Sequence, residues 1–194
     1  EIGVRLVGSE MCIRDRNIAS KKTWHGLKSP WIGTKNIWDL FSAVNLIDKE
    51  LYKTIKKISG PSWSEEFASL VYDDVAKHKV FITNLGKCTQ VDARPLPDSV
   101  YKEYLNLFLQ EIEIVNPKVI ILFGNQVSSI VLNKKISVSA SRKEMHPLKI
   151  KDKTYKAYPV YYPIGNGRFN INKSIEDINW IIKQELKEMV RIGE

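Results

Sequence analysis

The segment KVIILFG at residues 118–124 is a short apolar run that ends in a glycine. Two other segments share its richness in β-branched and aromatic residues, KVFITNL at residues 79–85 and AYPVYY at residues 157–162. Runs of this length and composition are typical of strands that are buried on both faces, as in parallel sheets. The three segments therefore predict neighbouring strands of one buried sheet.

Segments with helical periodicity lie between and around these strands. Residues 99–115 and residues 35–57 each carry apolar side chains at helical spacing. A last helix is predicted from the apolar face within residues 175–190, with Asn172 as its N-cap and Gly193 just past its end. Strands that alternate with helices predict an α/β fold, a three-layer α/β/α sandwich around a central, mainly parallel sheet of roughly four strands.

Composition restricts the class of protein. A chain of 194 residues with 43% hydrophobic content supports one domain. It has no apolar run of the roughly 20 residues that span a bilayer, so we expect a cytoplasmic protein that does not bind membranes. We also expect a monomer. The two cysteines, Cys12 and Cys88, form no disulfide or metal pattern. The net charge of +8 favours an anionic partner.

The first residues of the chain form an unusual stretch of sequence. GVRLVGSEMCIRDR at residues 3–16 resembles translated adapter read-through. We therefore interpret residues 1–16 as a non-native leader and residues 17–194 as a single domain that is truncated at its N-terminus. The alternative is that residues 4–8 form a genuine first strand, after which Gly8 turns the chain. If a native strand was lost, residues 4–8 could also fill its place.

Several motifs follow one another in an order that resembles a known family. They are FITNLGKC at residues 81–88, an arginine-proline loop at residues 93–95, NPKVIILFG at residues 116–124, and YYPIGNGRFN at residues 161–170. Together they resemble the iron-sulfur, thermophile-type branch of the uracil-DNA glycosylases, collinearly over residues 26–182. The resemblance implies a DNA-base excision enzyme whose site lies at the carboxyl ends of the strands.

The resemblance implies a base-reading role for Asn84. In the family, an asparagine at the end of the corresponding strand reads the flipped pyrimidine. An amide offers one acceptor and two donors, so it can pair with a ring N–H and a carbonyl of uracil and reject the different edge of cytosine. From the residue alone, a turn or cap asparagine remains the alternative.

The resemblance also implies a substrate-binding role for Trp31. Residues 29–33, SPWIG, resemble the family's proline-aromatic segment, whose ring stacks on the extruded base. Phenylalanine is usual at this place, and stacking tolerates the exchange for tryptophan. The alternative is a tryptophan buried only for packing.

Tyr162 occupies the place of a catalytic histidine. The segment at residues 161–169 resembles the family's second catalytic motif, a histidine followed by proline, and here Tyr162 precedes Pro163. A donor near the base carbonyl stabilises the negative charge that develops on the departing uracil. Tyrosine can donate, although more weakly than a preorganised histidine. His146-Pro147 matches the dipeptide literally but precedes the strand, so we interpret it as part of a loop.

The loop after Tyr162 is the predicted contact with DNA. Gly165, Asn166 and Arg168 resemble the family's DNA-inserting loop, in which glycines permit close backbone approach and the arginine meets a phosphate. We also assign Lys87 to DNA binding. A plain turn is the alternative for residues 165–168.

Two departures from the family's pattern bear on cofactor and activity. The branch holds an iron-sulfur cluster on four cysteines. Here Cys88 corresponds to one, another position falls near Tyr104, and an N-terminal pair is missing. We therefore predict no cluster, no other metal and no cofactor. The family's water-positioning loop should lie just before Trp24, where the adapter-like sequence intervenes, which makes the activity of this chain uncertain.

Two functional hypotheses follow. The first is a DNA glycosylase of base excision repair, which hydrolyses the N-glycosidic bond of uracil or a related damaged base with water as nucleophile. The second is a noncatalytic nucleic-acid-binding relative of the same fold, suggested by Tyr162 and the positive charge. An unrelated nucleotide-handling enzyme is disfavoured because neither GxGxxG nor GxxxxGK occurs.

Overall fold

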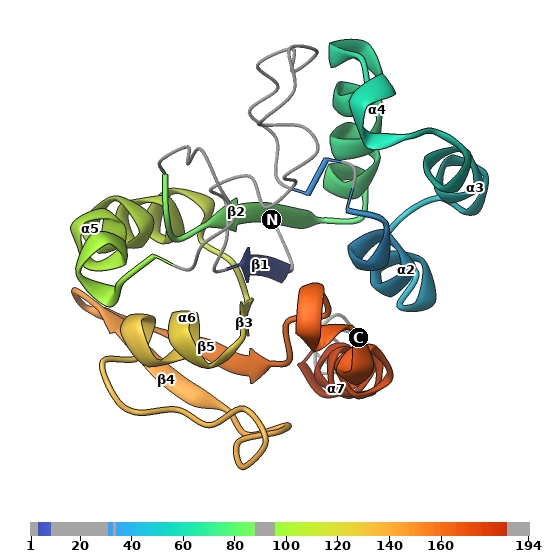
Figure 1. Ribbon diagram of the computed structural model, residues 1–194. Helices are drawn as coiled ribbons and strands as arrows, with labels where there is room; N and C mark the ends of the chain where they lie inside the picture. Colours follow the sequence, from blue (N-terminus) through green and yellow to red (C-terminus); the bar gives the residue numbers. More distant parts are fainter. Residues whose placement is uncertain (1–3, 9–30, 33, 88–95, 186–194) are drawn as a thin grey trace, which may run out of the picture.

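The structure is a computed structural model that describes residues 4–8, 31–32, 34–87 and 96–185. Its core is a sheet of five strands in the order β2-β1-β3-β5-β4 (Figure 1). The first four of these run parallel, and β4 is antiparallel to β5 at the edge. The strands are β1 (Val4–Gly8), β2 (Val80–Asn84), β3 (Val119–Phe123), β4 (His146–Ile150) and β5 (Lys153–Val160).

The predicted α/β class is confirmed, whereas the expected number of strands is wrong. The sheet has five strands because His146–Ile150 adds an antiparallel edge strand. Its side chains alternate between buried and exposed, which is the pattern of a strand with one solvated face. The interpretation of His146-Pro147 as a loop is therefore corrected. Pro147 suits this place because an edge strand tolerates a missing N–H.

Helices cover both faces of the sheet. α2, α3, α4 and α7 lie on one side in Figure 1, and α5 and α6 lie on the other. Each side has its own hydrophobic core, and β3 contributes to both: Phe123 faces the first group of helices and Leu122 the second. The helices are α2 (Lys35–Ala43), α3 (Lys49–Lys57), α4 (Glu65–Lys77), α5 (Asp98–Val115), α6 (Asn125–Val131) and α7 (Ile171–Glu185), with the 3-10 turns η1 (Gly60–Ser62) and η2 (Gly165–Asn170).

The predicted continuous helix at residues 35–57 is in fact two helices. The first ends at Ala43, and Asn45 then takes a left-handed backbone conformation with φ of 56°. Asp48 starts the second helix, because its carboxylate accepts hydrogen bonds from the backbone N–H groups of Glu50 and Leu51, both at 2.9 Å. An aspartate in this position is a preferred N-cap. The apolar stripe continues across the break, so the hydrophobic pattern alone predicted a single helix.

The first strand lies in the middle of the sheet. β1 pairs in parallel with β2 on one side and β3 on the other, so the described sheet has no gap there. The non-native origin of residues 1–16 remains a prediction, as does the truncation of residues 17–194. The register pairs Gly8 with Asn84, and Phe123 with Val160. Because Val7 pairs with Leu122, the next residues Gly8 and Phe123 are level, so these four residues form one row across four strands.

The last helix begins slightly before the predicted start. α7 starts at Ile171, directly after η2, so Asn172 lies inside its first turn and is not the N-cap. The predicted end at Gly193 lies outside the described residues. Among the described helices, none combines the length and the apolar character that crossing a membrane requires.

His146 predicts a pH dependence of stability. Its side chain is buried at the sheet edge, and burial, followed by the charge of Lys134, lowers its pKa below the ordinary 6.5. The folded state thus binds fewer protons than the unfolded state just below that value, so stability is full above pH 6.5 and falls as the pH drops through it.

We expect the free energy of unfolding, measured with urea, to fall between about pH 7 and pH 5 with a slope of at most about 1.4 kcal/mol per pH unit. The variant His146→Gln should show a clearly smaller fall. His78→Gln, which removes a histidine that contacts Asp74 at the end of α4, serves as the matched control and should keep the fall. Equal slopes for wild type and His146→Gln would contradict the assignment.

Candidate functional site

Asn84 is a buried amide without a partner. It ends β2 with 1% of its surface exposed. Neither its Oδ1 nor its Nδ2 has a hydrogen-bond partner within the part of the chain that the structure describes. Residues in one register row point to the same face of a sheet, so this amide faces the same side as Phe123 and Val160. Because buried amides are normally satisfied, this one is a candidate for contact with a ligand.

Trp31 and Tyr162 meet at the same edge of the sheet. The indole Nε1–H of Trp31 donates a hydrogen bond of 3.2 Å to the phenol oxygen of Tyr162, across 131 positions of sequence. Trp31 precedes α2, and Tyr162 follows β5. The structure therefore brings two of the predicted site residues into direct contact.

Phe123 links this pair to the sheet, a contact that no sequence motif had indicated. Its ring lies 6.1 Å from the rings of both Trp31 and Tyr162, measured between centroids. It also shares the register row of Asn84, two strands away. Strands are spaced by about 4.8 Å, so the Cα atoms of Asn84 and Phe123 are about 10 Å apart. The only available signal was its position as the last residue of a fully buried strand.

The loop after Tyr162 is closely packed against its own backbone. A Cβ atom on Gly167 would lie 1.8 Å from the carbonyl oxygen of Tyr162, so only glycine fits there. Gly165 has a φ of 60°, which also favours glycine. A hollow of about 280 Å³ adjoins this loop, lined by residues that include Gly124, Asn125 and Tyr162. The glycine at position 167 thus allows the η2 turn to pack against the backbone of Tyr162.

The predicted DNA contacts fall into different surroundings. Arg168 is exposed, and its guanidinium lies 4.9 Å from the ring centre of Phe169. Phe169 is 78% exposed, an unusual state for a large aromatic residue, and the sequence analysis had not singled it out. Asn166 belongs to the same η2 turn, and its side chain lies outside the described part.

Lys87 occupies a network within the protein. Its Nζ lies 2.7 Å from a carboxylate oxygen of Glu111 and donates at 2.7 Å to the hydroxyl of Thr83. A DNA phosphate would have to compete with this carboxylate. Cys88, the arginine-proline loop at residues 93–95 and the loop expected before Trp24 all lie outside the described residues. Within the described residues, no group of histidine, cysteine or acidic side chains could hold a metal ion.

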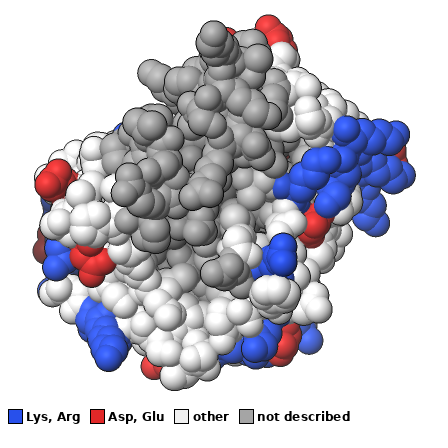
Figure 2. Space-filling view, viewed as in Figure 1, with Lys and Arg blue, Asp and Glu red and all other residues white. Residues whose placement is uncertain are grey.

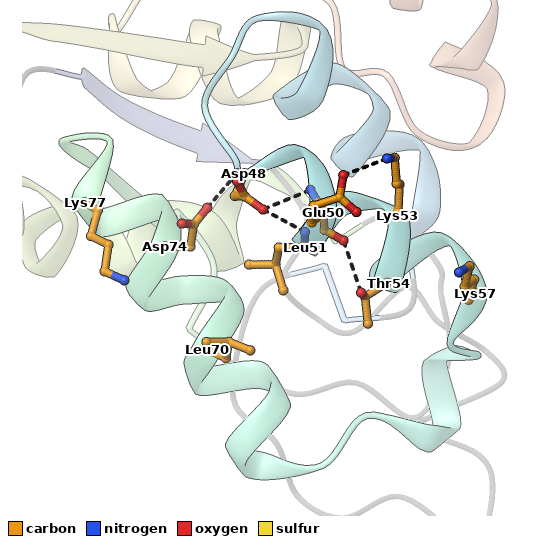
Figure 3. A pocket seen from close by; sticks show the side chains of 9 residues that line it. All are labelled: Asp48, Glu50, Leu51, Lys53, Thr54, Lys57, Leu70, Asp74 and Lys77. Atoms are coloured by element: carbon orange, nitrogen blue, oxygen red, sulfur yellow. Dashed lines mark hydrogen bonds and ion pairs between the residues drawn. The ribbon is translucent and has the colours of Figure 1, made fainter.

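A second hollow, of about 400 Å³, lies between α3 and α4 (Figure 3). Asp48, one of its lining residues, caps α3, and its backbone N–H donates a hydrogen bond of 2.8 Å to the carboxylate of Asp74 on α4. Acidic and basic side chains line this hollow in equal number, so its charge favours no anion. Its lining is Asp48, Glu50, Leu51, Lys53, Thr54, Lys57, Leu70, Asp74 and Lys77.

The face shown in Figure 2 carries a concentration of lysine and arginine side chains over α3. The helix sequence KELYKTIKK supplies these lysines. Two of them are neutralised locally, because Lys53 pairs with Glu50 at 2.6 Å and Lys56 with Asp39 at 2.7 Å. The positive charge of α3 is therefore weaker than its lysine content indicates.

A comparison with protein families gives an independent finding. Residues 28–180 match the model of the uracil DNA glycosylase superfamily. The matched range includes Trp31, Asn84 and Tyr162, as well as the whole sheet apart from β1.

Proposed function

Since the chain belongs to the uracil DNA glycosylase superfamily, we propose that it hydrolyses the N-glycosidic bond of uracil, or of a related damaged base, in DNA. The observation that carries this proposal is the buried, unpartnered amide of Asn84. It lies at the same edge and face of the sheet as the aromatic pair formed by Trp31 and Tyr162.

Asn84 is the proposed reader of the base. A base inside a duplex is out of reach, so the target nucleotide must first be extruded from the stack. Its ring N–H would then donate to Oδ1 of Asn84, and Nδ2 would donate to the neighbouring carbonyl. Cytosine presents an acceptor and a donor in the opposite order. Both buried atoms would thereby gain the partners that they lack in the free protein.

Tyr162 is the proposed donor to the leaving group. When the bond between the sugar carbon and the base nitrogen breaks, its electron pair stays on uracil, and a water oxygen bonds to the sugar carbon. A phenol O–H aimed at a uracil carbonyl would stabilise this developing negative charge. The water gives up one proton and the departing uracil anion takes one up, so the products are free uracil and an abasic sugar. The residue that positions this water is expected before Trp24, outside the described residues.

The η2 turn is the proposed contact with the DNA backbone and stack. Arg168 is exposed and suited to a phosphate, and Phe169 beside it exposes an apolar ring. Apolar side chains of this kind can enter a base step when a nucleotide leaves the stack. Gly165 and Asn166 complete the same turn.

The direct test uses end-labelled DNA that contains a single uracil, as single strand and as duplex. Excess protein should leave abasic sites that hot alkali converts to breaks, whereas matched oligonucleotides with thymine or cytosine should stay intact. Full retention of the uracil strand at high protein concentration would refute the enzymatic proposal.

Tyr162 keeps the second candidate open, because a phenol replaces the histidine that is usual in the family. A noncatalytic relative would bind DNA without cutting it. Binding isotherms for uracil and thymine oligonucleotides, measured at several salt concentrations, separate the cases. Equal affinities without excision would indicate backbone binding alone.

A further inference from the structure

The indole N–H of Trp31 has a defined acceptor. It donates to the phenol oxygen of Tyr162 at 3.2 Å, and an indole can only donate, so the phenol oxygen must be the acceptor in this contact. The hydroxyl proton of Tyr162 consequently points away from the indole. One side chain thus restricts the direction in which the other can donate.

The surroundings hold Trp31 in this place. Its backbone has a φ of 61°, a left-handed conformation that is strained for a bulky residue. Two hydrogen bonds stabilise it, because the carbonyl of Trp31 accepts from Thr34 N at 3.1 Å and from Trp38 Nε1 at 3.3 Å. Such strain persists only where neighbouring contacts over-determine it.

Packing limits the motion of the indole further. Trp31 is 5% exposed, and its ring makes T-shaped contacts with Phe41 and Phe123, each with a centroid separation of 6.1 Å. Phe123 also packs against the ring of Tyr162. Phe123 therefore packs against both the indole and the phenol, and Phe41 packs against the indole as well.

We propose that Trp31 is a positioning residue for Tyr162, and that its N–H orients the phenol and strengthens it as a hydrogen-bond donor to the departing base. An oxygen that accepts a hydrogen bond becomes a better donor through its own O–H. This gives Trp31 a task different from stacking on the base, and it offers a way for tyrosine to serve where histidine is usual. The inference rests on the proposed function.

A double-mutant cycle tests the coupling. Trp31→Phe keeps an aromatic ring and removes the N–H, and Tyr162→Phe removes the hydroxyl. In single-turnover excision of uracil, we expect Trp31→Phe to lower the rate constant about tenfold with little change in DNA affinity. Tyr162→Phe should lower it about 100-fold. The double variant should be no slower than Tyr162→Phe alone, because the N–H then has nothing to act on.

Trp63→Phe is the matched control. It makes the same chemical change at another buried tryptophan of the same core. Its effect, if any, should multiply with that of Tyr162→Phe. If the effects of Trp31→Phe and Tyr162→Phe multiply in the same way, Trp31 serves packing alone and the inference is overturned.

A second readout is independent of excision. In protein with ¹⁵N-labelled tryptophan, Tyr162→Phe should shift the indole N–H resonance of Trp31 upfield and leave that of Trp63 in place. An unmoved Trp31 resonance overturns the inference while leaving the proposed function intact. If Tyr162→Phe shifts the Trp31 resonance but the wild-type protein neither cuts uracil DNA nor binds free uracil, the proposed function is refuted, and with it the catalytic task given to Trp31.

Discussion

Replacing Asn84 with alanine is expected to lower uracil excision by about 100-fold or more and to leave the folded protein at least as stable as the wild type. The loss of activity follows from removing the amide that would pair with the base. The stability follows from the same amide, since both of its polar atoms are buried without partners. A buried unsatisfied polar group costs about 1–3 kcal/mol, which offsets the packing lost on truncation.

Asn125 provides the matched control for the stability measurement. Its Oδ1 accepts a hydrogen bond from the backbone N–H of Val138 at 2.8 Å, so this amide is satisfied. Asn125→Ala should lower the free energy of unfolding by about 1 kcal/mol or more, because Val138 is buried and its N–H loses its partner. Urea unfolding of both variants, beside single-turnover excision, gives the comparison.

The opposite pattern would assign Asn84 to structure. If Asn84→Ala unfolds as easily as Asn125→Ala and still prefers uracil over thymine, the amide supports the fold and reads no base. A residue kept for binding is expected to show the first pattern, since functional sites retain groups that the free protein leaves unsatisfied.

Local patterns in the sequence predicted the parts of the fold that depend on neighbouring residues. The apolar run at residues 118–124 became β3, and the helical spacing at residues 99–115 became α5. The same reasoning missed β4, because its five residues carry a histidine and a proline that are typical of loops. It also missed the break before Asp48, where the apolar stripe continues although the backbone turns.

The contacts that define the site depend on distant residues and leave no periodic signal. Order along the chain singled out Trp31 and Tyr162 separately, yet nothing in the sequence indicated that one donates to the other. Lys87 shows the same limit in the other direction. Its charge suggested DNA, whereas the fold brings Glu111 of α5 against it. Ion pairs of this kind depend on how distant helices and strands pack together, which local sequence patterns do not indicate.

Replacing Arg142 with alanine is expected to cost about 3–5 kcal/mol of stability, a large part of the total for a domain of this size. Arg142 forks onto Asp177, with Nε and Nη2 contacting its carboxylate at 2.8–3.1 Å. Asp177 is fully buried on α7. Without the guanidinium, that carboxylate would remain in the interior with no opposing charge from Arg142, which is the most damaging way to break a buried pair.

Lys143→Ala is the control for this prediction. Lys143 pairs with Glu176, whose side chain is 58% exposed, so we expect a loss of less than about 1 kcal/mol. Arg142→Lys should fall between the two, because lysine keeps the charge and loses the planar fork. Urea unfolding of the three variants gives the order, and equal losses for Arg142→Ala and Lys143→Ala would show that burial of Asp177 is not what makes the pair matter.

The same ion pair connects stability to the site. Arg142 lies in the segment between α6 and β4, and that segment also contributes Val138 to the hollow beside Tyr162. Asp177 lies on α7, which begins directly after the η2 turn that carries Arg168. Breaking this pair should therefore let the segment before β4 and the η2 turn, which both line the hollow beside Tyr162, move relative to each other. We expect Arg142→Ala to lower the rate of uracil excision for this reason. The double variant Arg142→Ala/Asp177→Asn removes the buried charge, so urea unfolding should show a partial recovery of stability. Single-turnover excision should stay reduced, because no ion pair joins the two segments.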